Sequence, residues 1–193
     1  MTMAAARRHL FLAGFMGTGK SAVGHQLAAR LHRPFVDLDG VVESLCRRTI
    51  PEVFRVEGEA AFRNHEARAL RLVLGSPPSI IALGGGAPTV PVILAMARQT
   101  GRTVLLTADW AAIWDRVRDD LPSRPLLAGT TVASGILGHD DPARREQFVR
   151  HAESLLQSRR DAYDRIADLV VDTSRLTIPL VVERIMEWLG NGL

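Results

Sequence analysis

The residues best suited to chemistry lie near the start of the chain, where glycines precede a lysine and a serine. The segment 14–21 reads GFMGTGKS and matches the spacing G-x-x-x-x-G-K-[ST] in full. Glycines at this spacing let backbone N–H groups turn toward phosphate oxygens, and the start of the next helix adds a positive dipole. We expect Lys20 to contact the β- and γ-phosphates of ATP and the Ser21 hydroxyl to bind Mg²⁺. The predicted ATP-binding residues of this segment are Gly17, Thr18, Gly19, Lys20, Ser21 and Ala22.

Lys20 is the only lysine of the chain, beside 23 arginines. A guanidinium is planar and bulky, whereas an ammonium is a compact point charge on a thin stem. The presence of the only lysine at this position therefore indicates that Lys20 contacts phosphates. The alternatives are chance and a glycine-rich turn that holds no ligand.

Two aspartates form a second candidate group, in the segment Asp37-Leu38-Asp39-Gly40. If the segment is extended, alternation puts both carboxylates on one side and Leu38 on the other. We expect one carboxylate to lie near Mg²⁺ and the other to accept a hydrogen bond from a substrate hydroxyl. The alternative is a turn in which Asp39 and Gly40 cap the next helix.

Three consecutive glycines, Gly84, Gly85 and Gly86, follow an apolar run. Such a run indicates that the backbone turns sharply or approaches something closely. Because the glycines come directly after a predicted buried strand, we expect them to belong to the site.

Two arginines stand where a solvated charge is not expected. Arg159 falls on the apolar stripe of a predicted helix over 142–166, four residues after Leu155. Arg63 is followed three positions later by Glu66, on the same side of another predicted helix. A charge on a buried stripe needs a partner, and two planar donors suit a substrate carboxylate. For each arginine the alternative is an internal salt bridge.

A further arginine, Arg124, lies in the stretch Ser123–Gly129, which has little periodicity. We expect this stretch to form the base of a mobile lid that covers approximately 120–147. Arg124 would then close onto the transferring phosphate and neutralise the charge that develops there.

The elements that must position these residues alternate between short buried strands and amphipathic helices. Strands are predicted at His9–Ala13, Pro34–Asp37, Ser79–Leu83, Thr103–Thr107 and Asp168–Asp172, and helices at Ser21–Leu31, 59–74, 90–98, 109–118, 142–166 and 178–189. This alternation implies an α/β fold with a parallel sheet covered by helices on both faces. Ligands of such sheets bind at the carboxyl ends of the strands. Without an internal repeat or a domain boundary, 1–193 is predicted to be one domain.

Composition narrows the functional class. With 47% hydrophobic and 23% charged residues, and no apolar run near the ~18 residues of a membrane span, we expect a globular protein with no membrane partner. The run Leu10–Met16 after two arginines resembles a signal peptide only faintly, because it is short and leads into the glycine-rich loop.

The net charge is +3, but the arginines do not cluster, so we expect an anionic ligand and no nucleic-acid partner. The single cysteine, Cys46, suits a reducing cytoplasm, where we expect a monomer.

The motifs, in their order and approximate spacing, resemble those of the shikimate kinase family. The matching segments are 14–21, Phe35–Asp39, Gly58–Glu59 with Phe62, Arg63 and Glu66, Gly84–Gly86, Arg124–Leu127, and Arg159 with Tyr163. The resemblance spans nearly the whole chain and implies ATP-dependent phosphorylation of the 3-hydroxyl of shikimate, on the route to chorismate and aromatic amino acids. It also implies the three-layer fold of the P-loop nucleoside monophosphate kinases, with a five-stranded parallel sheet in the order 2-3-1-4-5.

The resemblance further implies a role for each site residue. Lys20, Asp39 and Arg124 would be catalytic, and Asp37 would act on Mg²⁺ through water. The shikimate-binding residues would be Asp39, Arg63, Gly84, Gly85, Gly86 and Arg159, with the two arginines on the carboxylate and Asp39 on the ring hydroxyls. Adenine would lie between Arg116 and the loop Asp172–Pro179, and the apolar side of the ring would be lined by Phe54, Phe62, Pro125 and Leu126.

One departure from the family concerns the lid. Arg124 and Arg159 are 35 positions apart, more than the family usually has, and the excess lies in Thr130–Arg145. A longer lid could alter substrate choice. Two alternatives therefore stay open: a kinase of another carboxylated cyclitol or sugar acid, similar to gluconate kinase, and a nucleotide-binding regulator without kinase activity. The regulator would leave Arg159 and Asp39 with no reason to occur together.

Overall fold

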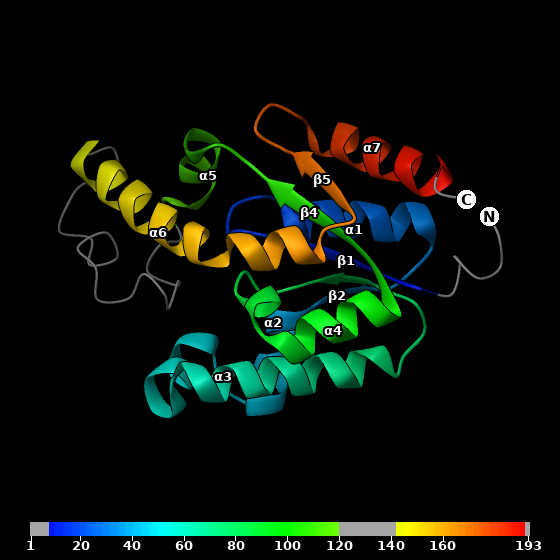
Figure 1. Cartoon of the computed structure of the whole chain (residues 1–193), viewed down its shortest axis with the longest axis horizontal. Helices are drawn as coiled ribbons and strands as arrows, with labels where there is room; N and C mark the ends of the chain where they lie inside the picture. Colours follow the sequence, from blue (N-terminus) through cyan, green and yellow to red (C-terminus); the bar gives the residue numbers. More distant parts are fainter. Residues whose placement is uncertain (1–7, 120–141, 192–193) are drawn as a thin grey trace.

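The computed structural model describes residues 8–119 and 142–191. In these ranges five parallel strands form one sheet in the order β2-β3-β1-β4-β5 (Figure 1). The strands are β1 (His9–Gly14), β2 (Phe35–Asp37), β3 (Ile80–Ala82), β4 (Gly101–Thr107) and β5 (Leu169–Asp172). In the register, Leu10 lies beside Ile80 on β3 and beside Arg102 on β4. The fold class and the strand order predicted from the sequence are confirmed.

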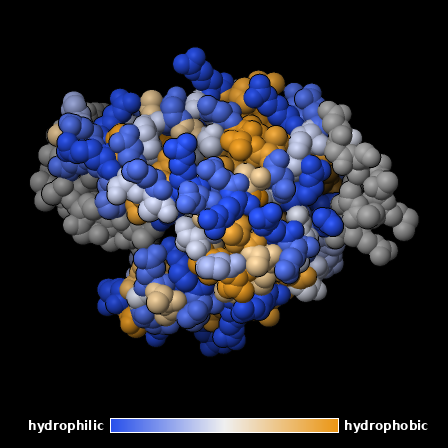
Figure 2. All heavy atoms as spheres, in the orientation of Figure 1, coloured by the Kyte–Doolittle hydropathy of each residue, from blue (hydrophilic) through white to orange (hydrophobic). Residues whose placement is uncertain are grey.

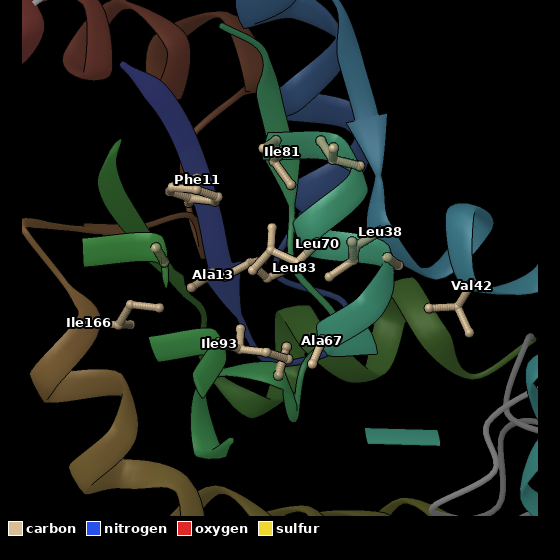
Figure 3. Packing of buried hydrophobic residues seen from close by; sticks show 14 of the residues in the cluster. Phe11, Ala13, Leu38, Val42, Ala67, Leu70, Ile81, Leu83, Ile93 and Ile166 are labelled. Carbon is tan, nitrogen blue, oxygen red and sulfur yellow. The ribbon is translucent and has the colours of Figure 1, made fainter. Parts of the chain in front are cut away.

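Helices cover both faces of the sheet because alternate residues of β1 face opposite sides. Leu10 and Leu12 pack against α1 (Lys20–Leu31) and α7 (Ile178–Asn191), together with apolar residues of β3, β4 and β5. Phe11 and Ala13 face the other way, into the largest core cluster (Figure 3). That cluster also contains residues of α2 (Leu38–Cys46), α3 (Ile50–Leu74), α4 (Pro91–Thr100) and the end of α6 (Pro142–Ile166).

A smaller cluster lies beyond the carboxyl end of β1. There Phe15 packs with Ile113 and Trp114 of α5 (Trp110–Val117) and with Phe148 and Ala152 of α6. Phe15 follows Gly14 in the glycine-rich loop, so this cluster fixes the loop against two helices. The carboxyl ends of β1, β2 and β3 lie at the same edge of the sheet, because all three strands are parallel. The loop, the two aspartates and the three glycines are therefore brought to one edge.

The prediction that Asp37 and Asp39 share an extended segment is wrong. Strand β2 ends at Asp37, and Asp39 belongs to the first turn of α2. Asp37 is the residue that caps this helix: its Oδ1 atom accepts a hydrogen bond of 3.2 Å from the backbone N–H of Asp39. The first N–H groups of a helix lack internal partners, and a carboxylate at the cap supplies one. The alternative of a cap formed by Asp39 and Gly40 is also not what the structure shows.

Helix α3 starts earlier than predicted. It begins at Ile50 rather than at 59, and a kink at Gly58 divides it (φ 81°, ψ 172°). The start is held from two sides, because the Thr49 backbone N–H donates to Glu52 and the Ile50 N–H donates to Glu43 of α2, at 2.8 and 2.9 Å. A short 3₁₀ turn, Ala87–Thr89, follows the three glycines.

Hydrophobic and hydrophilic side chains are mixed on the described part of the face that Figure 2 shows. The exposed large hydrophobic residues are spread over several elements: Leu45, Val56, Leu72, Val92, Val170, Ile178 and Leu180. Within the described ranges, no helix is both long and apolar enough to span a bilayer.

Candidate active site

The loop between β1 and α1 wraps around the amine of Lys20. The Lys20 Nζ atom donates to the backbone oxygens of Gly14 and Phe15, at 2.9 and 3.0 Å. The Thr18 side chain is buried, and its hydroxyl donates to the Phe15 oxygen at 2.8 Å, which ties the loop together. Gly17 and Gly19 have φ angles of 73° and 94°, which side chains rarely adopt. The loop thus has the open glycine backbone that a phosphate chain requires.

A cavity of about 610 Å³ lies in front of this loop. Its lining is formed by Met16, Gly17, Gly19, Lys20, Ser21, Ala22, Asp37, Asp39, Gly40, Glu43, Ala82, Leu83 and Arg116. With the exception of the buried Thr18, this lining includes every residue of the segment 17–22 that was predicted to bind ATP. Its charged groups combine an ammonium with carboxylates, as a site for phosphates and a metal ion would.

Ser21 and Asp37 meet at the floor of this cavity. The Ser21 hydroxyl donates to Asp37 Oδ2 over 3.0 Å. Both groups offer oxygen atoms, which Mg²⁺ prefers, and Mg²⁺ in kinases is held by one or two protein oxygens together with phosphates and water. In the described part of the chain, no group of three or more His, Cys, Asp and Glu side chains could hold a metal ion. The Ser21 hydroxyl and the Asp37 carboxylate are the two oxygen groups beside the loop that could hold Mg²⁺ in this way.

Arg116 ties the loop to the end of β5. Its Nη1 atom donates to the Gly17 oxygen and the Thr173 hydroxyl, both at 3.1 Å, and its Nη2 atom donates to the Thr173 oxygen at 2.8 Å. The guanidinium is exposed beside the segment predicted to contact adenine. Arg116 therefore lies between the glycine-rich loop and Thr173, at the start of the loop that was predicted to contact adenine.

A second cavity adjoins the first and collects the residues predicted to bind the acceptor. Asp39, Arg63, the three glycines and Arg159 all line it, as do Phe54 and Phe62. The remaining lining residues are Met16, Lys20, Ile50 and Glu66. Met16, Lys20 and Asp39 line both cavities. The two cavities therefore meet at two of the groups that were predicted to be catalytic, Lys20 and Asp39.

Sequence reasoning missed three lining residues of this second cavity. Ile50 was missed because the first half of α3 was not predicted, and Met16 because the loop motif leaves its position unspecified. Glu66 was considered only as a partner for Arg63. A signal for Glu66 was present, since it follows Phe62 by four positions and so falls on the buried stripe of α3.

The three glycines lie directly against charged side chains of the cavity, and two of them, Gly84 and Gly86, leave no room for a Cβ atom. A Cβ atom on Gly84 would lie 2.5 Å from Glu66 Oε1 and 2.8 Å from Asp39 Oδ1. One on Gly85 would lie 3.5 Å from Arg159 Nη1, an ordinary contact. One on Gly86 would overlap the guanidinium of Arg63. The glycine run is thus the surface on which these charged groups pack.

The two arginines differ in their partners. Arg63 forms ion pairs with Glu66 (2.6 Å) and Glu59 (2.8 Å), both on its own helix. Arg159 is 6% exposed, and no carboxylate of the described residues forms an ion pair with it. Its Cζ atom lies 5.8 Å from the centre of the Phe15 ring. The internal salt bridge that was the alternative is therefore present for Arg63 and is not seen for Arg159.

Tyr163 supports Arg159 one turn further along α6. Its hydroxyl donates to the Gly85 oxygen over 2.6 Å, which fixes the glycine run to the helix. Burial raises the pKa of Tyr163, and the neighbouring Arg159 offsets part of that rise. The phenol therefore stays neutral and can keep donating this bond at physiological pH.

Glu66 is the most deeply buried charged group of the site, with an exposed fraction of 0%. Burial raises the pKa of Glu66 to about 7; Arg63 acts against this rise, and Asp39 adds to it. Near neutral pH this carboxyl is therefore distributed between its ionised and neutral forms.

Arg124, Pro125 and Leu126 lie outside the described residues, as does most of the predicted lid. The described part of the lid, 142–147, belongs to the first turns of α6.

Comparisons with known proteins agree with this geometry. A family model described as shikimate kinase matches residues 16–190. The shikimate kinase of Desulforudis audaxviator is 38% identical over 182 residues, which cover 94% of this chain and 86% of the relative. That of Symbiobacterium thermophilum is 37% identical over 180 residues, covering 93% of this chain and 94% of the relative.

Solved structures give the same result. The shikimate kinase of Acinetobacter baumannii, determined in complex with shikimate, matches with a TM-score of 0.82 and 26% identity over 97% of this chain and 96% of that one. The enzyme of Bacteroides thetaiotaomicron matches with a TM-score of 0.78 and 30% identity over 96% of this chain and 99% of that one. With a matching family model, close relatives and the same fold, the chain belongs to the shikimate kinase family.

Proposed function

We propose that this chain transfers the γ-phosphoryl group of ATP to the 3-hydroxyl of shikimate. The observation that carries the proposal is the shared wall of the two cavities, where Lys20 and Asp39 face both. A phosphate chain along the glycine-rich loop and an acceptor in the second cavity would then meet at these two side chains. Phosphoryl transfer depends mainly on such positioning and on stabilising charge.

The carboxylate of the acceptor is assigned to Arg63 and Arg159. Arg159 is buried and no described carboxylate pairs with it, so an anion in the cavity would compensate its charge. Arg63 lies against Gly86, next to Gly85, against which Arg159 lies, and would supply the second guanidinium. Gly84–Gly86 line the same cavity as the two arginines.

Asp39 is assigned to the hydroxyl groups of the acceptor. Its carboxylate can accept the hydrogen bond that orients the reacting hydroxyl and can take its proton as the new bond to phosphorus forms. A loose transition state asks little of a base, so orientation is the larger part of this role. Lys20 would neutralise charge on the phosphates, and Arg124 is assigned the same task from the lid.

Mg²⁺ is assigned to the Ser21 hydroxyl and, through water, to Asp37. When bound with ATP, the ion neutralises charge on the phosphate oxygens. The hydrogen bond between Ser21 and Asp37 keeps both oxygens at the cavity floor. Arg116 and the loop 172–179 are assigned to the adenine.

We further propose that the chain acts as one domain and as a monomer in the cytoplasm. A single cysteine and the absence of a membrane-spanning helix in the described ranges support this proposal.

The deciding experiment compares acceptors. ADP formation from ATP and Mg²⁺ would be measured with shikimate, quinate and gluconate, and the phosphorylated position would be identified by ³¹P NMR. We expect kcat/KM for shikimate to exceed that for the other two by at least about 100-fold, the discrimination that hydrogen-bonded hydroxyls provide. A preference for quinate or gluconate would reassign the acceptor, and ATP binding without turnover of any of the three would favour a regulator.

A further inference from the structure

Glu66 lines the acceptor cavity but has no task in the proposed reaction. Its Oε2 atom accepts a hydrogen bond from Arg63 Nη1 over 2.6 Å. Its Oε1 atom is buried and has no hydrogen-bond partner among the described residues. A buried, ionised carboxylate oxygen without a donor is costly, and a proton on that oxygen lowers the cost by removing the charge.

The groups that face Glu66 come from three helices. Arg63 lies on the same helix, α3; Asp39 comes from α2 and Arg159 from α6. Glu66 Oε1 and Asp39 Oδ1 both lie within 2.8 Å of the position that a Cβ on Gly84 would occupy. Oε1 therefore faces the carboxylate side of the cavity, while Oε2 faces Arg63. Two carboxylates so placed disfavour each other's ionised form.

The carboxylate of an acceptor brings a further negative charge to the cavity that holds Glu66. Of the charged side chains that line this cavity, Lys20, Arg63 and Arg159 are positive, and Asp39 and Glu66 are negative. Glu59, the other partner of Arg63, is 56% exposed, so water stabilises its charge, whereas Glu66 is fully buried. An acceptor's carboxylate on Arg63 would compete with ionised Glu66 for the same guanidinium, and protonation of the buried Glu66 removes this competition.

We propose that binding of the acceptor's carboxylate draws one proton from solvent onto Glu66 Oε1. Glu66 then acts as a positioning residue for Arg63. Neutral Glu66 keeps its Oε2 contact with Arg63 but leaves the guanidinium's charge to the acceptor, whereas ionised Glu66 competes with the acceptor for that charge. This inference rests on the proposed function only in that the acceptor carries a carboxylate.

The pKa of Glu66, which burial raises to about 7, puts the effect within the range of ordinary assays. At pH 7 about half of the free enzyme already carries the proton, and at pH 8 about a tenth does. Proton uptake on binding should therefore be about half a proton at pH 7 and approach one at pH 8. The dissociation constant of the acceptor should rise by up to about fivefold between these two values.

The test is calorimetric titration of the full chain with shikimate, in two buffers of equal pH and different ionisation enthalpy. The difference in observed enthalpy between the buffers gives the number of protons taken up, without any need for turnover. We expect uptake by the native protein at pH 8, no uptake by Glu66→Gln, and uptake unchanged in Glu59→Gln. Glu59→Gln is the matched control because Glu59 also pairs with Arg63 but is exposed.

Two results would overturn the proposal. One is binding by the native protein without proton uptake at pH 8, which decides the question even if Glu66→Gln fails to fold. The other is uptake that persists in a folded Glu66→Gln variant, which would place the proton on a different group. If the acceptor screen selects quinate or gluconate instead, the proposed substrate fails on its own, and the same titration with that carboxylate still tests Glu66.

Discussion

The guanidinium of Arg63 occupies the space that a side chain on Gly86 would need. Position 86 therefore controls where Arg63 points, although Gly86 has no functional group of its own. Because the obstructing atoms belong to the end of a flexible side chain, an added methyl group should move Arg63 rather than unfold the protein.

Gly86→Ala should raise the KM for shikimate to nearly the same extent as Arg63→Ala, about 10- to 150-fold for a lost charged hydrogen bond. In a protein that already carries Arg63→Ala, Gly86→Ala should raise this KM little further, because the guanidinium that it would displace is absent. Steady-state kinetics of the two single variants and the double variant measure this coupling. Gly86→Ala combined with Arg159→Ala is the control, for which we expect more nearly additive effects. Fully additive effects of Gly86→Ala and Arg63→Ala on the KM would show that Gly86 does not act through Arg63.

Arg159→Ala should raise the KM for shikimate by about 10- to 150-fold, because the acceptor's carboxylate loses a charged, buried donor. The KM for ATP should change little. Arg160→Ala is the matched control, because Arg160 is the next residue of α6 and is exposed. Kinetics and thermal melts would be measured together. A variant Arg159→Ala that melts early but binds shikimate normally would identify the arginine as a purely structural residue.

Lys20→Met should lower kcat by at least about 100-fold, as expected when one charge-stabilising donor is lost. Lys20→Arg should also be severely impaired, because the two carbonyl oxygens that hold the amine, at 2.9 and 3.0 Å, suit a compact ammonium. Arg30→Lys, near the end of the same helix and exposed, is the control for a basic exchange. If Lys20→Arg keeps more than about half of the activity, less than about 1 kcal/mol is lost and the explanation of the single lysine is wrong.

Glu66→Gln should make stability less dependent on pH. The pKa of Glu66 is about 7 in the folded protein and 4.5 in a model compound. The folded state therefore binds this proton more tightly than the unfolded state. As a result, Glu66 does not lower the free energy of unfolding below pH 4.5, lowers it increasingly as the pH rises to 7, and lowers it by the full amount above pH 7. That cost is about 3 kcal/mol at most.

The measurement is urea unfolding of both proteins at several pH values between 4.5 and 8. Relative to the native protein, Glu66→Gln should gain stability as the pH rises through this window. Other titrating carboxyls are common to both proteins and cancel in the difference. A difference that stays constant across the window would mean that Glu66 titrates at its ordinary pKa.

Much of the architecture could be predicted because buried parallel strands appear in the sequence as short apolar runs between amphipathic helical segments. His9–Ala13 and Thr103–Thr107 were placed correctly to within two residues. The order of the strands followed from the family resemblance and not from the pattern itself. The parallel arrangement then brought residues far apart in the sequence to one edge of the sheet.

The parts that could not be predicted depend on local competition between hydrogen bonds. Asp37-Leu38-Asp39 fits both an extended segment and a capped helix start, and the cap prevails because the Asp39 N–H needs an acceptor. The helix was predicted to begin at 59, directly after Gly58, whereas in the structure it begins at Ile50 and continues across Gly58 with a kink. Burial of Arg159 could be predicted from its place on an apolar stripe. The pairing of Arg63 and the lack of a described ion-pair partner for Arg159 required the three-dimensional structure.

The amine of Lys20, held by two carbonyl oxygens in the glycine-rich loop, also makes this protein unusually simple to label. In the printed sequence no other side chain carries a primary amine. Reagents that acylate amines can therefore modify only this side chain and the α-amino group of the chain. The fraction of Lys20 that is acylated, measured by mass spectrometry, therefore reports the fraction of protein molecules whose loop holds no nucleotide.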